Sequence, residues 1–170
     1  MEVPPQGPSP AFPGGTVSRE KGPTLLVIED AQDQALLVGV AARRAHPGLE
    51  VHNAYNGVDG IAYLREVAPF TEAPTRPTPD LVILDLLMPE LDGFEVLGWL
   101  KERQDQLPFP VVVLTASSKA EDEARALTLG AVAVHKKPTD LAALGEVVQD
   151  VVHRWIGRSS IIGAHLRSMG

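Results

Sequence analysis

Polar side chains follow four of the short apolar runs of the sequence: Glu29 and Asp30, then Asp85, then Thr115, and then the pair Lys136 and Lys137. Three of these side chains are carboxylates, one is a hydroxyl, and the lysines offer an ammonium group. Carboxylates that gather at one place repel one another unless a cation lies among them. Hard oxygen ligands that leave room for water and a phosphoryl oxygen suit Mg²⁺. These residue types therefore predict a magnesium site that handles a phosphoryl group.

Asp85 is the candidate nucleophile of this site, because a carboxylate can attack a phosphoryl group directly and form an aspartyl-phosphate. The metal would neutralise charge, Thr115 would donate a hydrogen bond, and a lysine would pair with a phosphoryl oxygen. Asp85 also interrupts the most apolar stretch of the chain, where an unpaired charge is costly. Each residue alone has a plainer explanation, such as a helix-end charge, a cap or a solvated turn. Their combination at four strand ends favours the phosphoryl site.

The elements that must position these residues follow from the hydrophobic pattern. Continuous apolar runs of four or so residues predict strands that are buried on both faces. Four such runs cover 25–28, 81–84, 111–114 and 132–134, and a weaker one covers 49–54. Helical spacing of apolar residues recurs between the runs and predicts helices over 33–45, around 58–62, over 94–100, from Ser118, and over 141–155.

Two of these helices carry more specific predictions. In the first, the apolar stripe contains Leu36, Leu37, Val40 and Ala41. In the fourth, Ser118 and Glu121 have the spacing of a capping box.

Strand and helix alternate five times, which predicts a doubly wound α/β fold with right-handed crossovers. We expect a five-stranded parallel sheet in the flavodoxin-like order 2-1-3-4-5, with helices on both faces. In this order the first and third strands are neighbours, and ligands bind at the carboxyl ends of the strands where the strand order reverses. The three carboxylates, Thr115 and the pair of lysines would then lie at that edge.

The chain divides into three predicted parts. Residues 1–22 are rich in Pro and Gly and predict a disordered leader. Residues 23–156 hold all the periodic segments and predict one domain, within which the proline-rich segment 69–79 is a long surface loop. Residues 157–170 predict a short C-terminal tail.

Composition excludes several classes of function. The formal net charge is -7, which argues against a large nucleic-acid-binding surface. The chain has no Cys, so disulfides and thiol catalysis are excluded, and its five His residues lack metal-ligand spacing. It has neither an apolar run long enough to cross a membrane nor the pattern of a signal peptide, so we expect a cytoplasmic protein without membrane contact.

Four segments, LLVIEDAQDQ, PDLVILDLLMPELDGFEVL, VVVLTASSKAED and HKKPTDL, resemble the signature blocks of response-regulator receiver domains, in order. The resemblance covers about Thr24 to Trp155. It implies that Asp85 is the phospho-acceptor and Thr115 the switch hydroxyl. It also implies that Lys137, rather than Lys136, contacts the phosphoryl group.

The same resemblance implies the metal ligands. Asp30 would bind Mg²⁺ directly and Glu29 through water. Asp85 and the backbone carbonyl of Leu87 would complete the site.

The proline-rich loop and the TASSKAED block are similar to a subgroup of stand-alone receivers that partner phytochrome-type histidine kinases. The resemblance therefore implies a non-enzymatic protein whose partner is a sensor histidine kinase and which signals by protein-protein interaction or by phosphorelay. Gln34 and Leu37 on the first helix are candidate kinase contacts.

The face built from the fourth helix, fifth strand and fifth helix is the expected output surface, where a homodimer could form. Trp155 with Ile161 and Ile162 could pack at such an interface or complete the core.

Two positions depart from the pattern of the family. Receivers usually carry Tyr or Phe three residues before the phosphoryl-binding lysine, and here Val134 stands there with His135 beside it. The aromatic half of the switch is therefore missing, unless His135 replaces it in part. Leu87 is apolar where a polar side chain can help to position attacking water, which predicts a long-lived phosphoryl group.

Three other functions compete with this interpretation. A haloacid-dehalogenase-like phosphatase also has an Asp after an apolar strand, but it needs a second Asp where this chain has Leu87. A flavodoxin needs a phosphate-binding loop after the first strand, and the loop here is acidic. A receiver that acts as an unphosphorylated scaffold fits the missing aromatic residue but not the complete acidic set.

Overall fold

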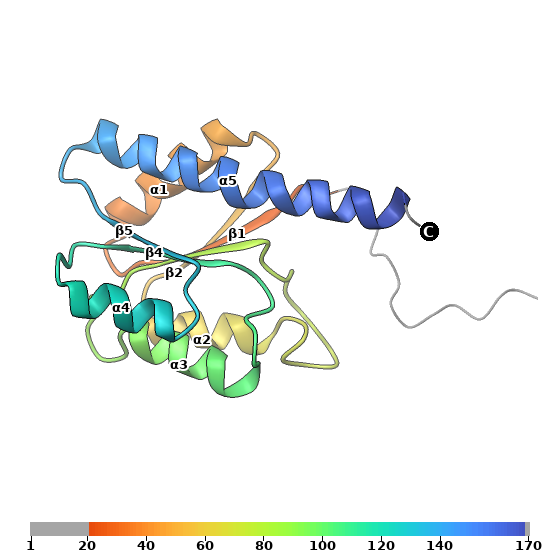
Figure 1. Cartoon of the computed structure of the whole chain (residues 1–170), viewed down its shortest axis with the longest axis horizontal. Helices are drawn as coiled ribbons and strands as arrows, with labels where there is room; N and C mark the ends of the chain where they lie inside the picture. The colour runs from red at the N-terminus through yellow and green to blue at the C-terminus, as the bar shows by residue number, and fades with distance from the viewer. Residues whose placement is uncertain (1–20, 169–170) are drawn as a thin grey trace, which may run out of the picture.

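The computed structural model describes the backbone of residues 21–168 and the side chains of residues 21–156. Its strands are β1 (Thr24–Ile28), β2 (Glu50–Ala54), β3 (Leu81–Leu84), β4 (Val111–Thr115) and β5 (Ala133–Lys136). Its helices are α1 (Gln32–Ala45), α2 (Gly57–Arg65), α3 (Gly93–Arg103), α4 (Ala120–Thr128) and α5 (Leu141–Ser168). Strands and helices alternate along the whole described chain, as expected (Figure 1).

The five strands form one parallel sheet in the order β2-β1-β3-β4-β5, which confirms the predicted topology. In the register between β1 and β3, Ile28 lies opposite Leu84. The two strands therefore end side by side, and the backbone N–H of Asp85 donates to the carbonyl of Ile28 at 3.0 Å. This pairing brings the residues that follow β1 next to those that follow β3.

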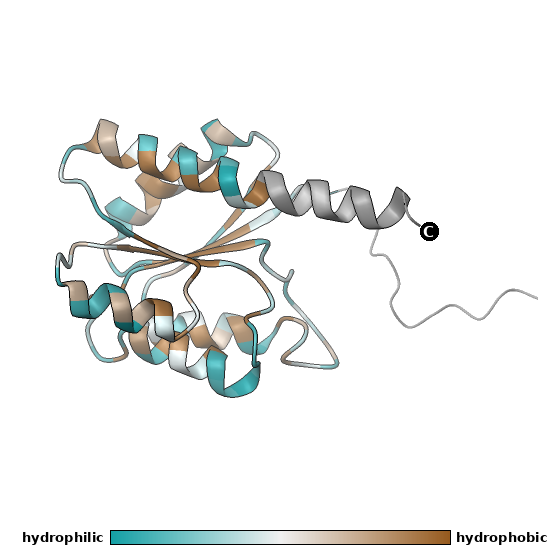
Figure 2. Cartoon of the chain, viewed as in Figure 1, coloured by the Kyte–Doolittle hydropathy of each residue, from teal (hydrophilic) through white to brown (hydrophobic). Residues whose placement is uncertain are grey.

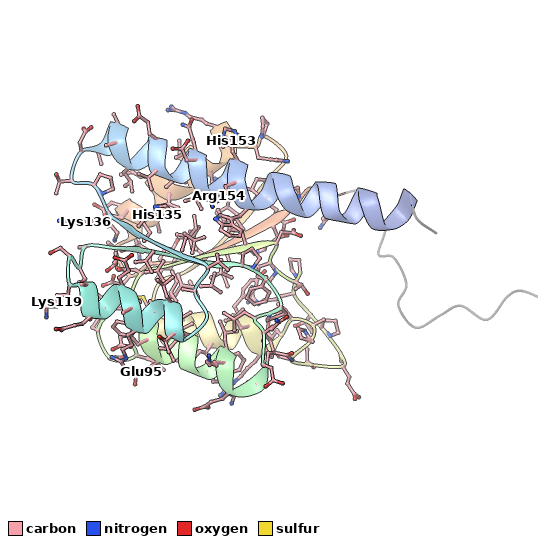
Figure 3. The ribbon with its side chains drawn as sticks, in the orientation of Figure 1. Glu95, Lys119, His135, Lys136, His153 and Arg154 are labelled. Carbon is pink, nitrogen blue, oxygen red and sulfur yellow. The ribbon has the colours of Figure 1, made fainter. Side chains whose placement is uncertain are left out.

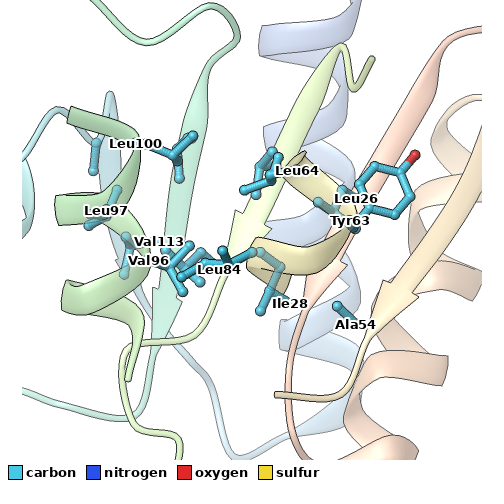
Figure 4. Close-up of a cluster of buried hydrophobic side chains, with 14 of the residues drawn as sticks. Leu26, Ile28, Ala54, Tyr63, Leu64, Leu84, Val96, Leu97, Leu100 and Val113 are labelled. Atoms are coloured by element: carbon cyan, nitrogen blue, oxygen red, sulfur yellow. The ribbon is translucent and has the colours of Figure 1, made fainter. Parts of the chain in front are cut away.

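Two helical layers cover the sheet: α1 and α5 lie on one face, and α2, α3 and α4 on the other (Figure 1). Because side chains of a strand alternate between faces, Leu26 and Ile28 of β1 enter the core under α2 and α3, while Leu25 and Val27 enter the core under α1 and α5. The apolar sides of the helices turn towards the sheet (Figure 2), and side chains fill both layers (Figure 3). Figure 4 shows part of the core under α2 and α3. The central strands are therefore buried between two apolar cores.

The predicted stripe of α1 is partly wrong. The helix buries Ala35, Val38 and Ala41, whereas Leu36 is 64% exposed and Val40 is 39% exposed. The physical reason is the close packing of α5, because an added Cβ at Gly145 would meet Ala41 Cβ at 4.0 Å. Small residues form this contact, and Leu36 and Val40 lie on the side of α1 that faces solvent.

The predicted capping box at Ser118 and Glu121 is wrong as well. The helix α4 begins at Ala120 with Lys119 at its N-cap, and no side chain caps it. The hydroxyl of Ser117 forms the local bonds instead, because it accepts from the Lys119 N–H and donates to the carboxylate of Asp122. A capping box does occur at the start of α3, between Asp92 and Glu95.

The ends of the chain differ in how far they are described. Residues 1–20 of the predicted leader lie outside the described part. The helix α5 continues without a break past residue 156, through most of the segment that we expected to form a tail, and the side chains of Ile161 and Ile162 lie outside the described part. Trp155 packs against the core under α1 and α5.

Within the described residues, no helix is both long and apolar enough to cross a membrane.

The proline-rich segment 69–79 is a surface loop, as predicted, and it is tied to α2. The backbone N–H of Thr75 donates to the carbonyl of Glu66 at 2.9 Å, and the hydroxyl of Tyr63 donates to the carbonyl of Pro77 at 2.9 Å. Burial raises the pKa of Tyr63 to about 12, so this hydroxyl keeps its proton and its bond to the loop.

Candidate functional site

The structure brings the three predicted carboxylates together at the carboxyl ends of β1 and β3. Glu29, Asp30 and Asp85 each offer an oxygen, and these oxygens all lie within 4.8 Å of one another. Glu29 and Asp85 are each only 5% exposed, whereas Asp30 is half-buried. Three hard, negatively charged oxygen ligands at such distances fit a divalent cation of the size and hardness of Mg²⁺.

The turn after β3 holds Asp85 in place. Its carboxylate accepts a hydrogen bond from the backbone N–H of Leu87 at 3.2 Å. The backbone N–H of Gly93 donates to the carbonyl of Leu86 at 3.1 Å, and an added Cβ at Gly93 would lie 2.3 Å from the carbonyl oxygen of Asp85. The start of α3 therefore touches the backbone that carries Asp85. Leu87 stands beside the carboxylates with its side chain exposed to solvent, and the roles expected of its carbonyl and its side chain stay predictions.

Lys137 reaches the same carboxylates from the loop after β5. Its ammonium nitrogen lies 2.9 Å from Glu29 Oε2, 2.8 Å from Gln34 Oε1 and 3.5 Å from Asp85 Oδ2. Its backbone N–H donates to the carbonyl of Thr115, which fixes the loop against β4. Lys136, by contrast, is exposed at the end of β5 (Figure 3). Lys137 is thus the lysine that occupies the site.

Thr115 is buried at the end of β4, next to the strand that carries Asp85. Its hydroxyl oxygen accepts from the backbone N–H of Ser117 at 3.2 Å. None of the hydrogen bonds found among residues 21–156 joins Thr115 to a carboxylate of the site. The hydroxyl lies on the adjoining strand with its proton available for another acceptor.

The missing aromatic residue leaves space beside Thr115. A pocket of about 220 Å³ is lined there by Thr115, Ser117, Ser118, Lys119, Asp122, Glu123, Val134 and Lys136. Val134 packs against the core under α2 and α3. His135 pairs with Leu114, which belongs to the opposite core, and successive strand residues face opposite ways. The suggestion that His135 replaces the aromatic residue is therefore wrong, because its side chain lies on the other face of the sheet.

Gln34 has a contact that sequence reasoning missed. We expected it to face a partner protein, but its amide oxygen accepts a hydrogen bond from Lys137. The two residues are 103 positions apart, so no local spacing could have indicated this pair. Only the folded sheet brings the start of α1 and the loop after β5 together.

Burial makes Glu29 a weaker acid than an ordinary glutamate. Desolvation raises its pKa to about 7, and the charge of Asp85 contributes, although the hydrogen bond and the charge of Lys137 oppose the shift. Because the pKa of Glu29 is higher in the folded than in the unfolded chain, its proton stabilises the metal-free fold. The full effect is present at pH values below 4.5, the ordinary pKa of a glutamate. This stabilisation is lost as the pH rises through about 7.

Because Glu29 must carry its negative charge to favour a cation in this cluster, even when it binds through water, the affinity for Mg²⁺ is expected to depend on pH in the same window. From about pH 7 downwards, the affinity is expected to fall about tenfold for each pH unit, which corresponds to one displaced proton. Isothermal titration calorimetry with Mg²⁺ at several pH values checks this. The Glu29→Gln variant is the control, because it should lose this part of the pH dependence. An affinity that is constant between about pH 5 and pH 7 in the wild type would contradict the assignment.

Comparison with known proteins agrees with this arrangement. Residues 25–149 match the response regulator receiver domain. A probable methanogenesis regulatory protein, FilR2 of Methanothrix harundinacea, is 30% identical over 144 residues, covering 85% of this chain and 90% of its own. The response regulator Rcp1 of Synechocystis is 29% identical over 142 residues, covering 82% of this chain and 95% of its own.

Solved structures give the same result. The phosphorylated cyanobacterial phytochrome response regulator RcpA superposes with a TM-score of 0.68 at 28% identity, covering 79% of this chain and 94% of its own. A Mn²⁺-bound form of Rcp1 also superposes with a TM-score of 0.68 at 28% identity, covering 78% of this chain and 94% of its own. The sheet order, the buried acidic cluster and the match over 25–149 lead to one conclusion: the chain belongs to the response regulator receiver domain family.

Proposed function

We propose that this chain is a phosphorylation switch in which Asp85 accepts a phosphoryl group from a histidine kinase. The observation that carries the proposal is one cluster in which Glu29, Asp30 and Asp85 lie within 4.8 Å of one another and Lys137 reaches two of them. A carboxylate nucleophile, a set of metal ligands and a cation for the phosphoryl oxygens are the parts that this transfer needs. The match to the receiver family supports this proposal over the phosphatase and flavodoxin alternatives.

The residues of the site divide the work. Asp30 and Asp85 would hold Mg²⁺ with the carbonyl of Leu87, and Glu29 would bind it through water. When bound, Mg²⁺ supplies the positive charge that balances the carboxylates and the incoming phosphoryl oxygens. The carboxylate oxygen of Asp85 forms the new bond to phosphorus as the bond to the donor nitrogen breaks.

The phosphoryl group adds a charge of about -1.5 to -2 at pH 7 beside Asp85. Lys137 is already 3.5 Å from the acceptor and can pair with a phosphoryl oxygen. Thr115, on the next strand, can turn its hydroxyl towards another. The resulting movement of the loops after β4 and β5 would alter the face formed by α4, β5 and α5, where Leu127 and Val132 are exposed. That face is the proposed site of output binding or of a homodimer.

The proposed partner is a phytochrome-type histidine kinase, and the proposed location is the cytoplasm. The support comes from the similarity to Rcp1 and to RcpA, which is a phytochrome response regulator. The apolar side chains Leu36 and Val40 on α1 and Leu141 on α5 are exposed, and α1 begins two residues after Asp30. A helix of the kinase could pack there while its phosphohistidine approaches Asp85.

Replacing Leu36 with serine is expected to slow phosphotransfer from an autophosphorylated phytochrome-type kinase by about tenfold, because an exposed anchor residue is lost. Labelling by acetyl phosphate, which needs no docking surface, should not change. The control is Leu127→Ser on α4, an exposed leucine away from α1. Transfer of radiolabelled phosphate, followed over time, measures the rates. Equal transfer to wild type and Leu36→Ser would rule out α1 as the docking surface.

A receiver that acts as an unphosphorylated scaffold is the second candidate. The observation in its favour is Val134, which leaves the pocket beside Thr115 without an aromatic ring. The two functions differ in whether Asp85 takes up phosphate at all.

A further inference from the structure

Gln34 occupies a helix position that usually has a local role. The helix α1 begins at Gln32, and its N-cap residue Ala31 has no side chain that can accept a hydrogen bond. A Gln at the third position of a helix often turns back to the N–H of the N-cap. Here Glu29 Oε1 accepts the Ala31 N–H at 3.2 Å, so the side chain of Gln34 is released from this role and reaches Lys137.

The three contacts of the Lys137 ammonium group are unequal. The distances to Gln34 Oε1 and Glu29 Oε2 are 2.8 and 2.9 Å, whereas the distance to Asp85 Oδ2 is 3.5 Å. Hydrogen bonds from nitrogen to oxygen normally span about 2.7–3.2 Å, so the contact with the acceptor is the weakest of the three. The Lys137 side chain is only 10% exposed, so water contributes little to its solvation. The ammonium group has three N–H donors, and its two short bonds hold the nitrogen beside Gln34 and Glu29. Moving the nitrogen towards a phosphoryl oxygen on Asp85 lengthens these bonds, so the two acceptors compete with the phosphoryl oxygen for its position.

Of these two competitors, Gln34 is the one that gives way more easily. Its amide oxygen is neutral, and hydrogen bonds between an ammonium group and a carboxylate are stronger than those to a neutral acceptor. Glu29 is buried and also bound to the backbone at Ala31. Gln34 is half-buried at the start of a helix and can rotate towards solvent.

We infer that Gln34 is a positioning residue that holds Lys137 against Glu29 and away from Asp85 in the unphosphorylated protein. Phosphorylation breaks the bond between Gln34 and Lys137, so its strength sets part of the free energy of switching. This inference rests on the proposed function, because it requires a phosphoryl group on Asp85.

The test uses beryllofluoride with Mg²⁺, a mimic of the phosphoryl group on an aspartate, and measures its affinity by calorimetry. The Gln34→Met variant keeps the volume of the side chain but removes the acceptor. It is expected to bind beryllofluoride about tenfold more tightly than wild type, which is about 1.4 kcal/mol. The matched control is Gln32→Met on the same turn of α1, where the side chain is exposed and the affinity should stay within about twofold.

A double-mutant cycle separates positioning from a general structural effect. In a Lys137→Met background, Gln34→Met should give no further change in affinity, because the residue it positions is gone. The Gln34→Glu variant keeps an acceptor and adds a negative charge. Its affinity for Mg²⁺ is measured separately, and beryllofluoride is then titrated into protein saturated with Mg²⁺. Under these conditions the variant should bind beryllofluoride more weakly than wild type.

Three results would overturn the inference: Gln34→Met that binds no more tightly than wild type, Gln34→Glu that binds more tightly, or an unchanged effect of Gln34→Met without Lys137. A wild-type protein that binds no beryllofluoride in saturating Mg²⁺ would instead count against the proposed function itself. The two failures are therefore distinguishable.

Discussion

Replacing Gly93 with alanine is expected to lower the free energy of unfolding by about 3 kcal/mol and to disturb the acceptor site. The reason is steric. An added Cβ would lie 2.3 Å from the carbonyl oxygen of Asp85 and 2.7 Å from Leu86 Cα. Both are backbone atoms, so no side-chain rotation can relieve the clash. Either α3 or the turn after β3 must shift, and Asp85 shifts with the turn.

The same substitution at Gly98 provides the control, because it lies in the same helix with no heavy atom within 4 Å of the added Cβ. Gly98→Ala is expected to raise the free energy of unfolding by about 0.5–1 kcal/mol, since alanine is the better helix former. Urea denaturation of the two variants measures the difference. Equal stabilities for Gly93→Ala and wild type would mean that α3 does not approach the acceptor as closely as described.

The second large effect is expected for Lys137→Met. Glu29 and Asp85 are almost fully buried, and Lys137 is the cation that contacts both. Removing one partner of a buried ion pair leaves an uncompensated charge, which costs about 3 kcal/mol. We expect the full loss in metal-free buffer at a pH well above neutral, where Glu29 is ionised. It should shrink towards acid pH, because protonation of Glu29 removes one of the two charges, and it should shrink in saturating Mg²⁺, because the metal replaces the lost cation.

Urea denaturation with and without Mg²⁺ measures this effect, and Lys136→Met is the matched control. Lys136 is the adjacent residue but is exposed, so its replacement should change the free energy of unfolding by no more than about 0.5 kcal/mol. A Lys137→Met protein that is as stable as Lys136→Met without metal would show that the carboxylates do not depend on this ammonium group.

The topology and the acidic cluster could be predicted from sequence because both depend on strong, regular signals. Short apolar runs such as 81–84 that alternate with helical patterns favour strands covered on both faces, and parallel strands in the order 2-1-3-4-5 end at one edge. A polar residue directly after each run then has a determined place. The proximity of Glu29, Asp30 and Asp85 follows from the positions of the strands and from their order in the sheet.

Other features depend on packing, which periodicity does not contain. Leu36 faces solvent because small residues form the contact between α1 and α5, and a pattern of apolar residues does not distinguish which of two faces packs. The hydroxyl that acts at the start of α4 belongs to Ser117 rather than Ser118, a difference of one residue in a turn. The bond between Gln34 and Lys137 joins residues that only the folded sheet brings together.

The measurement that tests the phosphorylation switch most directly is intact mass spectrometry after incubation with acetyl phosphate and Mg²⁺. Wild type is expected to gain about 80 Da, the mass of one phosphoryl group on a carboxylate, and Asp85→Asn is expected to gain nothing. Omitting Mg²⁺ should strongly reduce the adduct on wild type. An adduct on Asp85→Asn, or no adduct on wild type with Mg²⁺ present, would contradict the assignment of Asp85 as the acceptor, and the second result would favour the unphosphorylated scaffold.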